Sequence, residues 1–328
     1  MTVREIAVIK PSSMGDVIQT LPAVRFLKQS FREANLRWIV NPEWAPLLVG
    51  NSDLVEVIPF PRARFRGPLG FARFLAWSRP LANLRPDLTL DFQGLLRSAW
   101  IGRATRPRRF LGLRDAREGA ALFYDGAVNT HGIPHAVDRY LALARFAGAQ
   151  TTGPAEFPLP TGNALPNFPL PDRYMVLHPF ARGDRKSLVP DEISRLVQAL
   201  APLPVAVVGV SGRPLPLPPN GWSLLNRTTL LELIWLLRRA TFTVSVDSGP
   251  MHLAAALTDA LLSIHFWSDP RKVGPYRNGA WVWKEGRFQT VNEARQSTFA
   301  QGKQSRPSMD ALAGFMHDRW LQASRPAV

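Results

Sequence analysis

The sequence predicts an α/β protein with two domains, each built around a parallel sheet. In both halves of the 328 residues, short apolar runs of strand length alternate with segments of helix length, which is typical of parallel βαβ units. Between the halves, residues 154–172 contain six prolines, a density that neither a helix nor a central strand tolerates. We therefore predict an N-terminal domain over 1–153, a linker over 154–172 and a C-terminal domain over 173–306.

The N-terminal half provides the first series of elements. Strands are predicted over residues 6–9, 36–40, 55–58, 88–90 and 109–112. Helices are predicted over residues 17–31 and 95–103, and a third helix is predicted from the apolar positions Val137, Leu141, Ala144 and Phe146.

The C-terminal half repeats this alternation. Strands are predicted over residues 174–177, 205–208, 242–246 and 262–264, and helices over 191–200, 230–239 and 251–257. A last segment, 307–328, contains apolar residues at helical spacing between 308 and 323, so we expect it to form an amphipathic helix.

Composition limits the classes of protein to consider. An apolar content of 46% allows a sizeable core, and the absence of cysteine excludes disulfides, a thiolate nucleophile and cysteine-ligated metals. We find neither a signal peptide nor an apolar run long enough to span a membrane. These observations favour a cytoplasmic protein.

The positive charge is concentrated in one segment. Residues 62–117 hold 13 arginines, no lysine and three aspartates, which gives +10 of the net +15. Arginine binds phosphate through two hydrogen bonds, so this segment favours a phosphorylated partner near a membrane surface. A solvated basic surface is the alternative. Nucleic acid is disfavoured, because aromatic residues are not regularly interleaved with the arginines.

The first strand leads into a distinctive turn, Lys-Pro-Ser-Ser-Met-Gly-Asp at residues 10–16. Such strand-to-helix turns lie at the carboxyl edge of a parallel sheet, where open α/β folds bind ligands. Asp16 directly precedes the predicted helix. It can cap that helix, act as a general base, or do both.

A second turn, Val-Ser-Val-Asp-Ser-Gly-Pro-Met-His at residues 244–252, again joins a buried strand to a helix. Exposed N–H groups at Ser248 and Gly249 favour an anion such as a diphosphate, and Pro250 suits a first helical turn. Asp247 either caps the helix or accepts a hydrogen bond from a sugar or amine. His252 is either a ligand contact or a buried helical histidine.

Together these turns resemble those of the heptosyltransferase family, the glycosyltransferases that add L-glycero-D-manno-heptose to the lipopolysaccharide inner core. The matching stretches are residues 10–23, 90–98 (Leu-Asp-Phe-Gln-Gly-Leu-Leu-Arg-Ser), 135–139 (His-Ala-Val-Asp-Arg) and 244–257. They span most of the chain in the family order. The middle two look most like the branch that adds the first heptose to Kdo.

The resemblance implies the GT-B fold, with two facing Rossmann-like domains and a C-terminal helix that crosses back to pack on the N-terminal domain. It implies transfer from ADP-heptose, with inversion, to a Kdo-containing lipid A acceptor, with Asp16 as catalytic base. The residues that the resemblance implies for donor binding are Arg182, Lys186, Asp247, Ser248, Gly249, Pro250 and His252. Acceptor binding falls on Ser12, Ser13, Met14, Gly15, Gln93, Arg62, Arg64, Arg66 and Arg97.

We expect no required cofactor and no protein-bound metal, with Mg²⁺ at most a stimulating ion, because no Asp-x-Asp motif is present. The expected partners are the nucleotide-sugar donor, the phosphorylated lipid A/Kdo acceptor and the anionic inner membrane, touched peripherally on its cytoplasmic face. We expect no nucleic acid and a monomeric protein.

The chain departs from the family pattern on the donor side. Phe180 and Ala181 occupy a loop that in the family holds small or hydroxyl residues, and residues 209–219 hold no acidic residue. Two alternatives therefore stay open: a related glycosyltransferase with another nucleotide sugar, and a non-catalytic relative that binds a glycolipid or nucleotide. A nicotinamide-dependent oxidoreductase is excluded, since no G-x-G-x-x-G turn follows a predicted strand.

Overall fold

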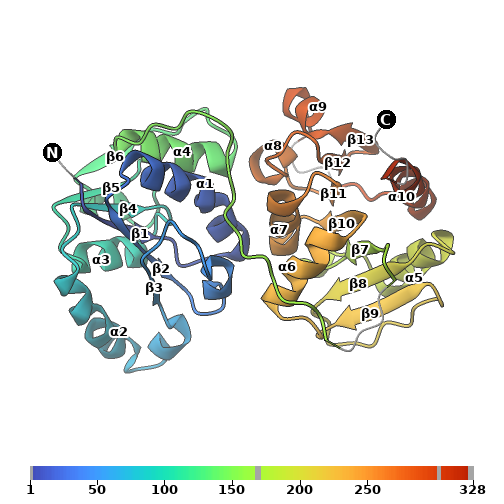
Figure 1. Ribbon diagram of the computed structural model, residues 1–328, viewed down its shortest axis with the longest axis horizontal. Helices are drawn as coiled ribbons and strands as arrows, with labels where there is room; N and C mark the ends of the chain where they lie inside the picture. Colours follow the sequence, from blue (N-terminus) through green and yellow to red (C-terminus); the bar gives the residue numbers. More distant parts are fainter. Residues whose placement is uncertain (1–2, 167–170, 301–303, 324–328) are drawn as a thin grey trace. The chain divides into compact units, whose positions relative to one another are not determined.

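The computed structural model describes residues 3–166, 171–300 and 304–323. The chain divides into two compact units, Met1–Pro160 and Thr161–Val328, so the boundary falls inside the proline-rich stretch 154–172. Each unit is an α/β domain with its own sheet and is described by itself (Figure 1).

The first unit is built on a six-stranded sheet in the order β3-β2-β1-β4-β5-β6, in which every pair of neighbours is parallel. The central strands β1 and β4 are almost entirely buried, as expected for parallel strands whose sheet is covered by helices on both faces. The strands are β1 (Glu5–Ile9), β2 (Asn35–Val40), β3 (Glu56–Pro59), β4 (Leu88–Asp91), β5 (Arg109–Leu113) and β6 (Gly126–Val128).

Helices cover both faces of this sheet. Figure 1 shows α1 and α4 on one side and α2 and α3 on the other, and α1 packs directly on α4. The α-helices are α1 (Met14–Ser30), α2 (Gly70–Ser78), α3 (Leu96–Ala104) and α4 (Ala136–Phe146). Short 3₁₀ turns are η1 (Ala45–Leu48), η2 (Arg62–Phe65), η3 (Arg79–Asn83) and η4 (Ala120–Phe123).

The second unit holds a seven-stranded sheet in the order β13-β12-β11-β10-β7-β8-β9, with only β13 antiparallel to its neighbour. The strands are β7 (Met175–His178), β8 (Val205–Gly209), β9 (Gly221–Leu225), β10 (Phe242–Val246), β11 (Leu261–Ile264), β12 (Trp281–Lys284) and β13 (Arg287–Thr290). The helices are η5 (Asp184–Lys186), α5 (Pro190–Ala199), α6 (Leu230–Arg239), α7 (Gly249–Leu257), α8 (Pro270–Val273), α9 (Val291–Gln296) and α10 (Met309–Ala323).

The two parallel sheets predicted from the alternating pattern are confirmed, and the predicted strands agree with the observed ones to within one or two residues. The elements that the sequence analysis missed are α2, α8, α9, β6, β9, β12 and β13. No described helix is long and apolar enough to cross a membrane.

The last helix, α10, packs within the second unit. It lies against α5 and β10, and its buried side chains Leu312, Ala313, Met316 and Trp320 belong to the core that also contains strands β7 and β10. Its apolar face is therefore already covered there. Packing of this segment back on the N-terminal domain stays a prediction.

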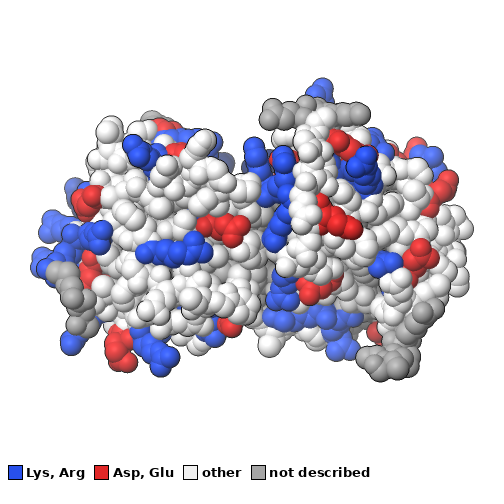
Figure 2. Space-filling model, turned by 90° about the horizontal axis from the view of Figure 1, so that it is seen from above, with Lys and Arg blue, Asp and Glu red and all other residues white. Residues whose placement is uncertain are grey.

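Charged side chains are spread over both units. On the face shown in Figure 2, basic and acidic side chains lie between wide uncharged areas rather than in one continuous patch.

Candidate active site

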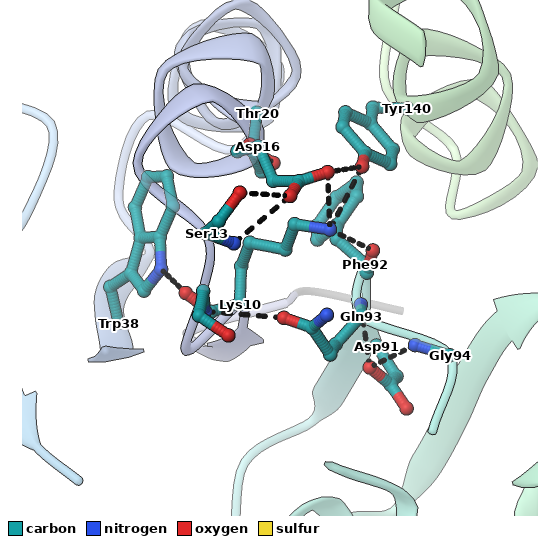
Figure 3. A network of polar contacts seen from close by, with 11 residues as sticks. Lys10, Ser13, Asp16, Thr20, Trp38, Asp91, Phe92, Gln93, Gly94 and Tyr140 are labelled. Atoms are coloured by element: carbon teal, nitrogen blue, oxygen red, sulfur yellow. Dashed lines mark hydrogen bonds and ion pairs between the residues drawn. The ribbon is translucent and has the colours of Figure 1, made fainter. Parts of the chain in front are cut away.

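Asp16 closes the N-terminus of α1. The backbone N–H and the hydroxyl of Ser13 donate to Asp16 Oδ2 at 2.9 and 2.7 Å, which forms a capping box over the first turn (Figure 3). Ser13 precedes the helix in an extended conformation, as an N-cap residue does. The capping role of Asp16 is confirmed, and the cap fixes one carboxylate oxygen and orients the other.

Lys10 lies beneath this carboxylate at the end of β1. Its Nζ donates to the carbonyl of Phe92 and to the hydroxyl of Tyr140, both at 2.8 Å, and lies 3.5 Å from Asp16 Oδ1. The Tyr140 hydroxyl in turn donates to Asp16 Oδ1 at 3.2 Å. Figure 3 shows the three side chains converging from β1, α1 and α4.

The charges in this network follow from burial and proximity. Burial by itself would lower the pKa of Lys10, but the Tyr140 hydroxyl and the Asp16 carboxylate raise it above its usual value. Burial raises the pKa of Tyr140, against the pull of the lysine. At neutral pH the network therefore holds a charged lysine and a neutral tyrosine.

Asp16 differs from its neighbours in exposure. Its side chain is 38% exposed, whereas that of Lys10 is 3% exposed. A carboxylate that is fixed from below and open from above can accept a proton from a bound hydroxyl. This arrangement fits a general base.

A second loop at the same edge follows β4 and is organised by Asp91. This buried carboxylate accepts from the backbone N–H groups of Gln93 and Gly94 and from two hydroxyls, those of Ser98 and Tyr124. Burial raises the pKa of Asp91, and the four hydrogen bonds work against that rise. Asp91 is therefore a structural group that shapes the loop.

Gln93 links the two loops. Its Oε1 accepts from the backbone N–H of Ser12 at 3.2 Å, and Gly94 beside it adopts φ +68°, a conformation that suits glycine. A hydrogen bond thus joins the turn after β1 to the loop after β4 near Asp16 (Figure 3), and residues of both segments contribute to one surface.

A pocket of about 500 Å³, including open solvent at its mouth, lies on this surface. Four residues predicted to bind the acceptor line it: Ser12, Arg62, Gln93 and Arg97. Its other lining residues are Pro11, Phe60, Leu95, Ser98, Ile101 and Glu118.

The remaining predicted acceptor residues are placed differently. Ser13 serves the cap, while Met14 and Gly15 are buried in the first turn of α1, so the Met14 side chain belongs to the core. Arg64 and Arg66 are exposed and do not line the pocket.

The candidate donor edge lies in the second unit, where β10 runs into α7. Ser248 precedes α7 in an extended conformation, and Pro250 occupies the first turn, as predicted for an anion-binding helix start. The Ser248 hydroxyl lies 3.0 Å from the Val246 carbonyl and 3.2 Å from Nδ1 of His178. The turn is therefore tied to the end of β7.

Two buried histidines at this edge are neutral. Burial lowers the pKa of His178 to about 4 and that of His265 to about 4. His265 contacts the hydroxyls of Ser263 and Ser268 at 3.1 and 3.0 Å, so its ring is held by neutral partners. Neither imidazole supplies positive charge at neutral pH.

Lys186 lies near the same edge. It ends η5, which follows β7, and its Nζ lies 4.4 Å from the ring centroid of Trp267, which follows β11. Arg182 is exposed, and Phe180 packs on the core with its ring 6.5 Å from that of His178. Asp247 and His252 are each half-buried beside the turn. No group of three or more acidic or histidine side chains suited to a metal occurs among the residues described.

The sequence analysis gave no role to Lys10, Tyr140 or Trp267. Lys10 is the first residue of the matched stretch 10–23, and Tyr140 directly follows the matched residues 135–139. This proximity to the family motifs is the sequence signal that points to both residues. Trp267 carries no such signal, because only the fold brings it to Lys186.

Comparison with known proteins adds the family. The family model of glycosyltransferase family 9 (heptosyltransferase) matches residues 75–207 and 217–302, about two thirds of the chain. Lipopolysaccharide heptosyltransferase 1 of Escherichia coli K12 is 28% identical over 312 residues, 88% of this chain and 95% of that protein. Lipopolysaccharide heptosyltransferase 1 of Pseudomonas aeruginosa is 30% identical over 294 residues, 83% of this chain and 81% of that protein.

Solved structures agree on the architecture. The E. coli heptosyltransferase WaaC with ADP superposes with a TM-score of 0.74 at 24% identity, over 96% of this chain and 99% of that one. The E. coli ADP-heptose lps heptosyltransferase II gives 0.77 at 21% identity, over 98% of this chain and 100% of that one. Two Rossmann-like units of this kind constitute the GT-B fold. With the family model matching well over half of its length, the chain belongs to glycosyltransferase family 9, the heptosyltransferases, and is a glycosyltransferase.

Proposed function

We propose that this protein is an inverting heptosyltransferase that transfers heptose from ADP-L-glycero-D-manno-heptose to a Kdo-containing lipid A acceptor. Relatives named lipopolysaccharide heptosyltransferase 1 support the activity, and the E. coli enzyme has been solved with ADP and with ADP-2-deoxy-2-fluoro heptose. We expect the protein to act as a monomer at the cytoplasmic face of the inner membrane.

The observation that carries this proposal is the restrained carboxylate of Asp16. Ser13 holds Oδ2, Lys10 and Tyr140 hold Oδ1, and the side chain stays 38% exposed. In the proposed reaction Asp16 takes the proton of the acceptor hydroxyl. The hydroxyl oxygen attacks the anomeric carbon, the bond to the ADP oxygen breaks, and the configuration inverts.

The acceptor is proposed to bind in the pocket beside Asp16. Arg62 and Arg97 line it together with Gln93 and Ser12, and guanidinium groups suit carboxylate and phosphate ligands. Both kinds of anion occur in a phosphorylated Kdo-lipid A acceptor. In this proposal two arginines of the basic segment 62–117, Arg62 and Arg97, contact the acceptor.

The donor diphosphate is proposed to bind at the start of α7. The backbone N–H groups at the start of α7, near Ser248 and Gly249, and the positive end of the helix dipole favour an anion, and Lys186 adds a full charge. Asp247, Pro250, His252 and Arg182 are proposed to complete the donor contacts. These groups stabilise the leaving ADP without a protein-bound metal, so we propose that no cofactor is required and that Mg²⁺ is at most stimulating.

The test of the mechanism is Asp16→Asn in the purified protein. Transfer is measured as ADP release, and donor binding is measured by calorimetry. We expect turnover to fall by roughly 10²–10⁴-fold with donor affinity nearly unchanged.

Glu293→Gln is the matched control, because Glu293 closes the same kind of capping box with Thr290 at the start of α9. Both variants lose a capping charge, but only Asp16→Asn should lose turnover. Unchanged turnover would remove Asp16 from the mechanism.

The donor is tested by comparing the binding of ADP-heptose, ADP, UDP-glucose and GDP-mannose. Selective binding of ADP-heptose and ADP supports the proposal. Preference for another nucleotide would change the proposed donor. It would agree with the presence of Phe180 in the loop after β7, where its aromatic ring lies beside that of His178. No binding would point to a non-catalytic relative.

A further inference from the structure

The first unit exposes a group of large apolar side chains on two neighbouring helices. Phe71 on α2 is 65% exposed, and Leu96 and Trp100 on α3 are 45% and 38% exposed. The rings of Phe71 and Trp100 lie 6.4 Å apart, while Leu96 and Trp100 are one helical turn apart on the same face. We call Phe71, Leu96 and Trp100 the apolar band.

The apolar band is not a loosened part of the core. Helix α2 has a separate buried face, where Phe74 packs edge-on against Phe65 of η2 at 5.5 Å and stacks with Trp77 at 6.2 Å. Phe71 therefore points to solvent while the helix is anchored by other rings. Contiguous exposed aromatic side chains of this kind mark interaction surfaces.

The chain around α2 is strongly basic. Residues 57–86 contain no acidic residue and six arginines, and every one of these arginines is exposed: Arg62, Arg64, Arg66, Arg73, Arg79 and Arg85. Two acidic residues lie beside α3: Glu118 accepts from the backbone N–H of Leu96 at its start, and Asp125 pairs with Arg103 near its end. Aromatic side chains among arginines suit the interface of an anionic bilayer.

The apolar band also lies beside the acceptor pocket. Leu95, Arg97, Ser98 and Ile101 of the α3 region line the pocket, whereas Leu96 and Trp100 face outward from the same helix. A lipid-anchored substrate keeps its acyl chains in the bilayer. A bilayer resting on the apolar band would therefore present such a head group at the mouth of the pocket.

We propose that the apolar band docks the protein on a bilayer that contains anionic phospholipids, and that the exposed arginines of residues 57–86 add electrostatic attraction to it. The proposal builds on the proposed function, because it explains how a lipid-linked acceptor reaches Asp16. It does not require the acceptor itself, since the occupant of the surface is the bulk bilayer.

The test is sedimentation of the full chain with vesicles that lack acceptor, made either of phosphatidylethanolamine with phosphatidylglycerol or of phosphatidylcholine alone. We expect binding to the anionic vesicles only, weakened by salt. The double variant Phe71→Ser, Trp100→Ser should bind about tenfold or more weakly. The pair Arg66→Gln, Arg73→Gln should lose a similar factor at low salt.

Val55→Ser is the matched control. Val55 is 54% exposed and lies at the amino ends of β2 and β3, whereas the acceptor pocket lies at the carboxyl ends of the strands. It should bind vesicles like the unaltered protein. Phe71→Ser alone, at the most exposed position, covers the case in which the double variant does not fold.

The outcomes separate the two proposals. Loss of vesicle binding in Phe71→Ser, with unchanged transfer to a deacylated acceptor, supports the docking surface. Equal binding by all variants, equal binding to phosphatidylcholine, or self-association that these substitutions abolish would overturn it. A protein that binds vesicles through the apolar band but transfers no heptose would refute the proposed function alone.

Discussion

Replacing the buried lysine under the catalytic candidate tests the network most directly. Lys10→Met keeps the length of the side chain and removes its charge and its three donors. The change leaves the Phe92 carbonyl and the Tyr140 hydroxyl without the ammonium that lies 2.8 Å from each, and it removes the positive charge 3.5 Å from Asp16 Oδ1.

The size of the effect follows from that distance. Two unit charges 3.5 Å apart interact by about 5 kcal/mol at an effective dielectric constant of 20 and by about 1 kcal/mol in bulk water. Asp16 is 38% exposed, so solvent screens the pair and a value of about 1–3 kcal/mol is appropriate. Loss of this stabilising free energy shifts the pH at which Asp16 ionises upward by about one to two pH units.

The assay is the pH dependence of kcat. Lys10 stabilises the ionised form of Asp16. In Lys10→Met the Asp16 carboxylate should therefore stay protonated up to a higher pH. The acid limb of the pH profile of kcat should move upward by about one to two pH units. Lys284→Met is the control, since Lys284 is a buried lysine of the second unit, near the Phe266 carbonyl. An acid limb at the same pH in Lys10→Met and the unaltered protein would refute the electrostatic role of Lys10.

Three further changes test the rest of the site. Tyr140→Phe removes the donor that lies 3.2 Å from Asp16 Oδ1, and a lost hydrogen bond of about 1 kcal/mol should lower kcat about fivefold without changing donor affinity, as steady-state kinetics will show. Trp267→Ala removes a contact worth about 0.5–1 kcal/mol, so calorimetry should find ADP bound two- to fivefold more weakly, but not when Lys186→Ala is already present. The pKa values of about 4 for His178 and His265 lie below the ordinary 6.5, so only the unfolded chain binds these protons as the pH falls from 6.5 to 4. Stability is therefore lost over that window, by about 3 kcal/mol for each histidine, and urea denaturation of His265→Gln should show a flatter dependence on pH.

The fold could be predicted where apolar runs are long and buried on both faces. The predicted strand 242–246 is β10 itself, because every residue of that strand is buried. Helix α2 was missed because its buried positions are few, with Phe74 and Ser78 set among exposed arginine and alanine residues. The hairpin of β12 and β13 was missed because its turn places Glu285 at φ +51°, where Asn or Gly is the recognised signal.

The site could be predicted where its partners are local. Asp16 and Ser13 are three residues apart, so their cap is visible in the sequence. Tyr140 meets Asp16 across 124 residues and Lys10 across 130, and no spacing rule shows which lysine a fold will bury. The sequence therefore indicates the candidate carboxylate, whereas only the packing of α4 on α1 shows what restrains it.

The two candidate edges use charge in opposite ways. In the first unit a buried cation, Lys10, faces the carboxylate of the proposed base Asp16, so turnover should follow pH through that pair. In the second unit the buried groups His178 and His265 are neutral above about pH 5, and the positive charge near the proposed diphosphate site comes from Lys186 and the start of α7. Donor affinity should therefore be flat between pH 5 and 8 as far as those groups are concerned.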